Sequence, residues 1–222
     1  MKMNILCVGN SILHHGPSEA LGWKGDWGMA ASCRENDYFH LLQKGLEERF
    51  PEIEFVFREN NAYALENGIR DDENKDYTEI FNQVFGESLK VMIPDVVLLQ
   101  CGDNCKHDLT TDTAYANAMK QVIKMFRDIN PEIQVVMCLP WYGELVDSKQ
   151  IGTLIASRDV NCNFVNLNKH HIRENTAHGL FEHDGVQEHP GDKGMRAIAD
   201  TFIDAVTKII NKEVKYPWGE LR

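Results

Sequence analysis

The sequence has no long hydrophobic run, and its basic residues are outnumbered by acidic ones. No stretch approaches the roughly 20 apolar residues that a membrane-spanning helix needs. Among the 222 residues, 23 are Lys or Arg and 34 are Asp or Glu, which gives a formal net charge of −11. Such a surface repels phosphate backbones and anionic lipid headgroups. We therefore expect binding neither to nucleic acid nor to a membrane surface.

A secretory leader and a paired-cysteine motif are also missing. The apolar run at residues 5–8 is brief and no small-residue cleavage site follows it, so we expect a cytoplasmic protein. The cysteines form no C-x-x-C pair; they are Cys7, Cys33, Cys101, Cys105, Cys138 and Cys162. Three of them lie in or beside apolar runs, which predicts reduced thiols that pack as small hydrophobic side chains.

The sequence shows no internal repeat, low-complexity tract or linker, which predicts one domain over residues 1–222. Short apolar runs alternate instead with segments of helical period. The runs that predict strands are residues 5–8, 53–57, 96–99, 133–138 and 164–167. The segments that predict helices are residues 38–50, with Asp37 as N-cap, 77–85, 112–126, 151–155 and 195–210.

This alternation predicts an α/β fold of three layers, α/β/α, with a doubly wound parallel sheet. Five strands in this rhythm suit the flavodoxin-like order 2-1-3-4-5. Ligands of such sheets bind beyond the carboxyl ends of strands 1 and 3, where the strand order reverses. Functional residues should therefore follow Val8 and Gln100.

Three loops at this edge carry residues suited to nucleophilic catalysis. Ser11 follows the first strand in Gly9-Asn10-Ser11, and Asn104 follows the third in Gly102-Asp103-Asn104. His189, held by Pro190, follows the fifth. Serine needs a base to take its proton, and an amide can donate to a developing oxyanion. Each segment alone is typical of an ordinary turn, so the prediction rests on their coincidence at one edge.

These segments resemble the blocks of SGNH (GDSL-like) hydrolases, which read G-D-S, G-x-N-D and D-x-x-H-P. Residues 9–11, 102–105 and 189–190 match them in the order that the family requires. The resemblance implies Ser11 as nucleophile and His189 as base. It also implies an oxyanion hole formed by the Ser11 backbone N–H and the Asn104 amide, with no cofactor. Residues 22–32 resemble a subset of bacterial members linked to carbohydrate deacylation.

The chain departs from the family pattern at several positions. Asn10 and Cys105 stand where the family has aspartates, and Val186 occupies the position of the usual acid. We predict that Asp184 orients His189, with a main-chain carbonyl as the alternative, which would leave a Ser–His dyad. Gly68 is the candidate for a further oxyanion donor.

Other residues of these loops are candidates for lining the site. His14 is close to Ser11 in sequence, and Trp23, Trp27 and Trp141 lie in loops on the same edge. The tryptophans fit a substrate wall and loop packing equally well. Several adjacent histidines raise the possibility of a metal site, but no H-x-x-x-H or C-x-x-C pattern supports one, so no metal is expected.

Taken with the resemblance, these residues predict a serine esterase. Its substrate would be a small-molecule or carbohydrate ester with a short acyl group, O-acetyl on a sugar for example. Two alternatives stay open. One is a non-catalytic carbohydrate- or partner-binding domain, favoured by the missing acid. The other is a metal-dependent hydrolase that uses the histidine-rich loop.

Overall fold

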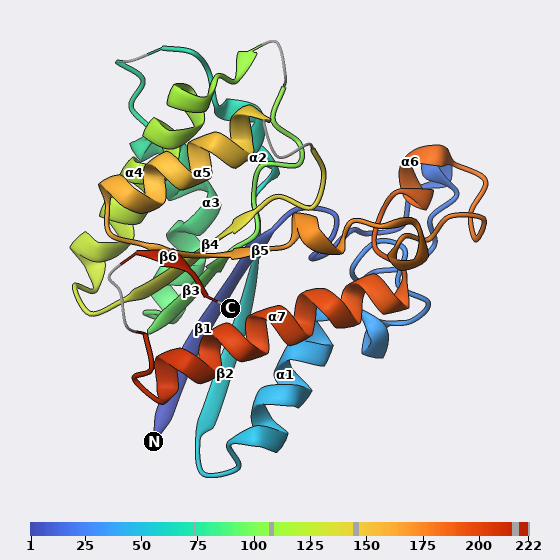
Figure 1. Cartoon of the computed structure of the whole chain (residues 1–222), viewed down its shortest axis with the longest axis horizontal. Coiled ribbons are helices and arrows are strands. Elements are labelled where there is room, and N and C mark those ends of the chain that lie inside the picture. Colours follow the sequence, from blue (N-terminus) through green and yellow to red (C-terminus); the bar gives the residue numbers. More distant parts are fainter. Residues whose placement is uncertain (73, 107–108, 144–146, 215–217, 222) are drawn as a thin grey trace.

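A computed structural model describes residues 1–72, 74–106, 109–143, 147–214 and 218–221. Its centre is a parallel sheet in the order β2-β1-β3-β4-β5-β6 (Figure 1). The strands are β1 (Lys2–Gly9), β2 (Glu54–Asn61), β3 (Val96–Leu99), β4 (Gln134–Leu139), β5 (Asn163–Asn166) and β6 (Gly219–Glu220). The order 2-1-3-4-5 is confirmed. The sixth strand was not predicted, because two residues are too few to show a period.

Helices cover both faces of the sheet. They are α1 (Tyr38–Arg49), α2 (Tyr63–Gly68), α3 (Thr78–Val91), α4 (Asp112–Ile129), α5 (Ser148–Asp159), α6 (Asp184–Gln187) and α7 (Asp192–Ile210). Short 3₁₀ helices span Glu19–Leu21, Arg34–Asn36, Asn168–His170 and Arg173–Asn175. Figure 1 shows α3, α4 and α5 on one side of the sheet, with α1 and α7 on the other. The three-layer prediction is therefore confirmed.

The central strands are buried on both faces because alternate side chains belong to different cores. Val97 and Leu99 of β3 pack in the core beneath α3 and α4, whereas Val96 and Leu98 pack in the core beneath α1 and α7. Asp37 caps α1 as predicted, since its carboxylate accepts the His40 N–H at 2.8 Å. In the described residues every cysteine is a free thiol, and no helix is long and apolar enough to cross a membrane.

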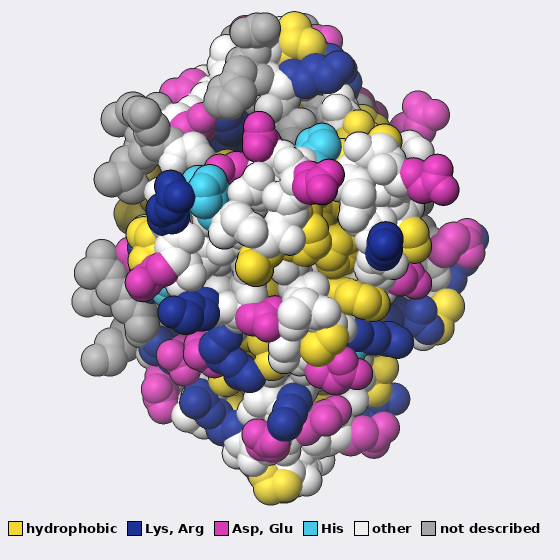
Figure 2. All heavy atoms as spheres, turned by 90° about the vertical axis from the view of Figure 1, so that its right-hand side faces the viewer, with side chains coloured by type: hydrophobic (Ala, Val, Ile, Leu, Met, Phe, Trp, Pro, Cys, Tyr) yellow, Lys and Arg dark blue, Asp and Glu magenta, His cyan; other side chains and the backbone are white. Residues whose placement is uncertain are grey.

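Two long connections lie together at the carboxyl edge of the sheet. Residues 10–37 follow β1 and residues 167–191 follow β5, and they meet on the right of Figure 1. A small apolar core joins them, in which Trp23 and Met29 from the first pack with Ala177 and Val186 from the second. The face seen in Figure 2 carries apolar side chains near its centre, framed by charged ones.

The first connection starts without a helix. A polar residue that follows a strand in an α/β fold often begins the next helix, but residues 11–13 form only a turn, and α1 begins at Tyr38. Two isolated antiparallel bridges, His15 with Trp27 and Ser18 with Trp23, fold the following residues into a hairpin-like loop instead.

Candidate active site

Ser11 and His189 meet at the switch point of the sheet. The Ser11 Oγ lies 2.7 Å from His189 Nε2, although the two residues are 178 positions apart. The Ser11 loop leaves β1 at Gly9, where an added Cβ would come within 2.6 Å of Gln100 Oε1 and 2.7 Å of Leu13 Cβ. A residue with a side chain would push this turn away from β3. Glycine therefore permits the approach that places Ser11.

The other ring nitrogen of His189 faces a main-chain oxygen. Its Nδ1 lies 2.7 Å from the Gly185 carbonyl oxygen and 3.1 Å from the Tyr142 hydroxyl. Since Nε2 presents its lone pair to the Ser11 hydroxyl, Nδ1 carries the proton and donates it to Gly185. Burial lowers the pKa of His189 to about 4, so the ring is neutral at pH 7, as a general base must be.

The predicted contact between Asp184 and His189 is wrong. Asp184 is exposed at the first turn of α6, and among the described residues its carboxylate accepts a hydrogen bond from Gln187 Nε2 alone, at 3.4 Å. The cause is the backbone of residues 184–187, which turns as a short helix and points the Gly185 carbonyl, rather than the acid, at the ring. The geometry is that of a Ser–His pair oriented by a carbonyl.

A substitution at Asp184 tests this arrangement. Because the Asp184 carboxylate contacts no atom of His189, Asp184→Asn should keep kcat for an acetyl ester within about threefold of the unmodified chain. The measurement is steady-state hydrolysis of 4-nitrophenyl acetate. A loss of a hundredfold or more would restore Asp184 as the orienting acid.

Asn104 lies at the same cavity as the Ser–His pair. The cavity has a volume of about 520 Å³ and is lined by Ser11, His15, Leu21, Met29, Asn61, Tyr63, Asn104, His183, Gly185, Val186 and His189. Within the described chain, the Ser11 backbone N–H has no acceptor. Two donors, this N–H and the Asn104 amide, thus lie near the Ser11 hydroxyl and are suited to binding an anionic oxygen.

Beneath Ser11 lies a network of amides and carboxylates. Asn10 Nδ2 donates to Glu66 Oε1 at 3.1 Å and to Asp103 Oδ2 at 3.0 Å. Asp103 also accepts from Gln100 Nε2 at 2.7 Å and from the Tyr142 N–H at 2.9 Å. Burial raises the pKa of Asp103, and burial together with the charge of Asp103 raises the pKa of Glu66 to about 7.

This network gives a physical reason for Asn10, which stands where the family has aspartate. An aspartate there would set a third carboxylate about 3 Å from two others and remove both Nδ2 donors. Asn10→Asp should therefore lower the free energy of unfolding by about 3 kcal/mol or more. The repulsion is largest when all three groups are ionised, so the loss should be greater at pH 8 than at pH 5. Urea unfolding of the variant and the unmodified chain at both pH values measures this loss. An Asn10→Asp protein as stable as the unmodified chain at pH 8 would contradict the account.

Four side chains predicted to line the substrate pocket do not line it. His14 lies against the carboxylates of Glu59 and Asp26, at 2.7 and 2.9 Å, and it is His15 that reaches the cavity. The indoles of Trp23, Trp27 and Trp141 donate to the main-chain oxygens of His15, Ala31 and Glu188 respectively. These tryptophans hold the loops together, which was the alternative interpretation.

Gly68 is not a donor at this cavity. It ends α2, and a Cβ added there would lie 2.5 Å from Ile80 Cδ1, so the glycine lets α2 approach α3. The cavity is lined instead by Asn61, the last residue of β2, and Tyr63, the first residue of α2. The position of a glycine in the sequence after a predicted strand does not identify the contacts that it makes in the fold.

Among the described residues, no three His, Cys, Asp or Glu side chains are grouped so that they could hold a metal ion. The neighbouring histidines have separate partners. His170 Nε2 lies 2.9 Å from the Thr201 hydroxyl, and His171 packs against the rings of Trp141 and Tyr142.

Comparison with solved structures shows which known proteins share this fold. No protein-family model matches the sequence, and no curated protein is significantly similar to it. Solved structures do match. A psychrotrophic esterase from Pseudoalteromonas sp., determined with monoethylphosphonate as inhibitor, has a TM-score of 0.56 and 14% identity over 94% of this chain and 98% of its own. The chain has the fold of an esterase.

Two carbohydrate esterases from Clostridium thermocellum share this fold. The family 3 enzyme has a TM-score of 0.59 and 14% identity over 96% of this chain and 99% of its own. The family 2 enzyme, solved in complex with cellohexaose, has a TM-score of 0.60 and 14% identity over 94% of this chain and 65% of its own. At these identities the similarity shows the common architecture.

Proposed function

We propose that this protein is a serine esterase that removes short acyl groups, such as acetyl, from a carbohydrate. The observation that carries the proposal is the 2.7 Å contact between Ser11 Oγ and a neutral His189, in a cavity that Asn104 also lines. A hydroxyl paired with a neutral imidazole beside free N–H donors is the arrangement that acyl transfer needs.

The reaction would proceed in two steps through an acyl-enzyme. His189 takes the proton of Ser11 as its oxygen attacks the ester carbonyl, and the oxyanion is bound by the Ser11 N–H and the Asn104 amide. His189 then protonates the leaving alcohol, and water repeats the sequence on the acyl-enzyme. The Gly185 carbonyl oxygen keeps Nδ1 protonated throughout. This dyad would lack the charge that an aspartate provides to stabilise the imidazolium.

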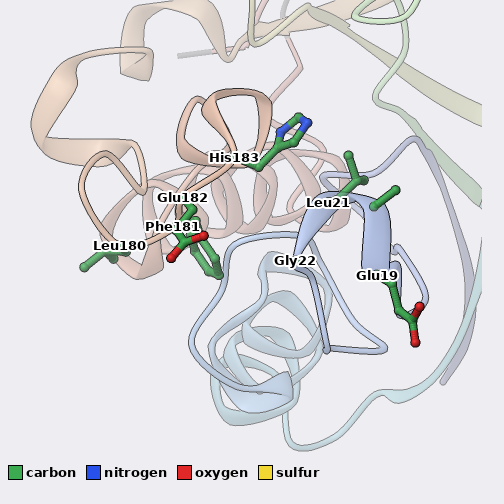
Figure 3. Close-up of a pocket in the computed structure, with 8 residues that line it drawn as sticks. Glu19, Leu21, Gly22, Leu180, Phe181, Glu182 and His183 are labelled. Atoms are coloured by element: carbon green, nitrogen blue, oxygen red, sulfur yellow. The ribbon is translucent and has the colours of Figure 1, made fainter.

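A second hollow adjoins the catalytic cavity and suits the alcohol part of the ester. It has a volume of about 510 Å³, and it shares Leu21 and His183 with the cavity that holds Ser11. Figure 3 shows Leu21 and His183 on facing segments. The side chains of Glu19 and Leu180 are directed away from the space between these segments. Its mixture of apolar and polar groups fits a sugar ring, which has both kinds of surface. The carbohydrate esterases that share the fold support the same substrate class.

The test is covalent labelling together with turnover. The protein should hydrolyse 4-nitrophenyl acetate and react with a fluorophosphonate, and the adduct should map to the peptide that contains Ser11. If the protein showed neither labelling nor turnover, the result would favour a carbohydrate- or partner-binding role instead. Turnover that is abolished by a chelator, without labelling of Ser11, would favour the metal-dependent alternative.

Acyl-chain length should bring no gain in efficiency. The buried apolar wall near Ser11 consists of Met29 and Val186, and no long apolar groove continues from it among the described lining residues. Each methylene that became buried would contribute about 0.8 kcal/mol, or roughly fourfold in kcat/KM. We expect no such rise from acetyl through butanoyl to octanoyl 4-nitrophenyl esters, compared at equal enzyme concentration. A steady increase along that series would indicate an acyl groove and a lipase-like role.

A further inference from the structure

A fully buried carboxylate lies behind the candidate oxyanion hole. Glu66, in α2, has no exposed surface and does not line the cavity. Its Oε2 accepts the Asn104 Nδ2–H at 2.8 Å. Its Oε1 accepts the Gly102 N–H at 2.6 Å and Asn10 Nδ2–H at 3.1 Å. None of its hydrogen bonds in the described chain is to Ser11 or His189, so it is not a member of the Ser–His pair.

Every partner of Glu66 is a donor, which suits the ionised carboxylate and no other form. In the described part of the chain no Lys or Arg is paired with it. A protonated carboxyl or a neutral amide would bring one of its own hydrogens against a donor. A buried carboxylate can stay ionised when hydrogen bonds from the protein replace those that it made to water.

We infer that Glu66 is a positioning residue: it fixes the orientation of the Asn104 amide, so that the second Nδ2–H is directed to the cavity where the oxyanion forms. This inference rests on the proposed esterase function. An asparagine amide can turn over and exchange its oxygen with its nitrogen at little intrinsic cost. The reversed orientation would bring Asn104 Oδ1 against Glu66 Oε2. It would also present an acceptor, rather than a donor, to the oxyanion.

The charge of Glu66 makes this orientation dependent on pH. None of the titratable groups that interact electrostatically with Glu66 is cationic. They are Asp103, Tyr115 and the thiols of Cys101, Cys105 and Cys138. Burial and Asp103 raise the pKa of Glu66 to about 7. Below that pH a proton on the carboxyl weakens its hold on Asn104. The pKa of His189, about 4, keeps the base neutral over the same range, so protonation of His189 does not account for a change in kcat near pH 7.

A double-mutant cycle tests the inference, on a protein already shown to hydrolyse 4-nitrophenyl acetate and to be labelled at Ser11. Absence of that activity would be a failure of the proposed function, not of this inference. Glu66→Gln keeps the side-chain shape but sets an amide N–H against a donor, which favours the reversed Asn104. We expect kcat to fall about 10- to 100-fold with KM within about threefold. The double variant Glu66→Gln/Asn104→Ala should have a kcat within about threefold of Asn104→Ala alone.

The control is Asp37→Asn, which also neutralises a buried carboxylate that accepts main-chain N–H groups, at the cap of α1. It should leave kcat near the unmodified value. Full kcat in Glu66→Gln, or losses that multiply in the double variant, would overturn the inference. If Glu66→Gln does not fold, pH profiles decide instead. The unmodified chain should lose kcat as pH falls through about 7, and Asn104→Ala should lack that limb. A flat profile in the unmodified chain, or the same limb in both proteins, would overturn it.

Discussion

Replacing Ser11 with alanine should lower kcat for 4-nitrophenyl acetate by about a thousandfold or more, because removal of a nucleophile leaves only the binding and oxyanion contributions. The fold should survive the change. Ser11 is held by its main chain, whose carbonyl oxygen accepts the Met29 N–H at 2.8 Å, and alanine keeps that bond. The removed hydroxyl is bonded only to His189 among the described residues.

Ser18→Ala is the matched control for this prediction. Ser18 belongs to the same loop, and its hydrogen bonds are made by main-chain atoms. It should keep the kcat of the unmodified chain. Thermal unfolding and far-ultraviolet circular dichroism of both variants check that the loop remains folded. If Ser11→Ala retained a tenth of the activity, another residue or bound water would have to be the nucleophile, and the proposed function would be abandoned.

The fold could be predicted because its signals are local. The β3 run of four apolar residues, Val96 to Leu99, is typical of a strand covered on both faces, and the periodic stripe of α7 is typical of a helix on a sheet. Topology rules for alternating strands and helices leave few strand orders, and 2-1-3-4-5 is one that suits five such strands. The meeting of Ser11 and His189 follows from that order, since both loops leave the same edge.

The parts of the site that were missed depend on contacts that leave no local signal. The Gly185 carbonyl faces His189 because residues 184–187 turn as a short helix, and main-chain oxygens are not distinguished by residue type. Glu66 reaches Asn104 across 38 positions from a helix of six residues that was not predicted. The one signal was Asn10: an amide where the family has an acid indicates that other carboxylates lie nearby, as Glu66 and Asp103 do.

Asn104→Ala should lower kcat by about 100- to 1000-fold, equivalent to about 2.7–4 kcal/mol of transition-state stabilisation, while KM changes little. The amide has its largest effect when negative charge develops on the carbonyl oxygen, so its loss affects the transition state more than the bound ester. The Ser–His contact at 2.7 Å does not involve Asn104. Fluorophosphonate labelling of Ser11 should therefore still be detectable in this variant, although slower.

The same substitution also affects folding, and the two effects must be separated. Asn104→Ala leaves Glu66 Oε2 buried without its Nδ2 donor, which costs about 1–3 kcal/mol of folding stability. Activity is therefore compared well below the unfolding temperature of the variant. Asn130→Ala is the control, because its amide donates to the Pro94 carbonyl oxygen away from the cavity; it should lose stability but keep kcat. An Asn104→Ala protein with raised KM and unchanged kcat would place this amide in ground-state binding of the ester, and the oxyanion would then need a different donor.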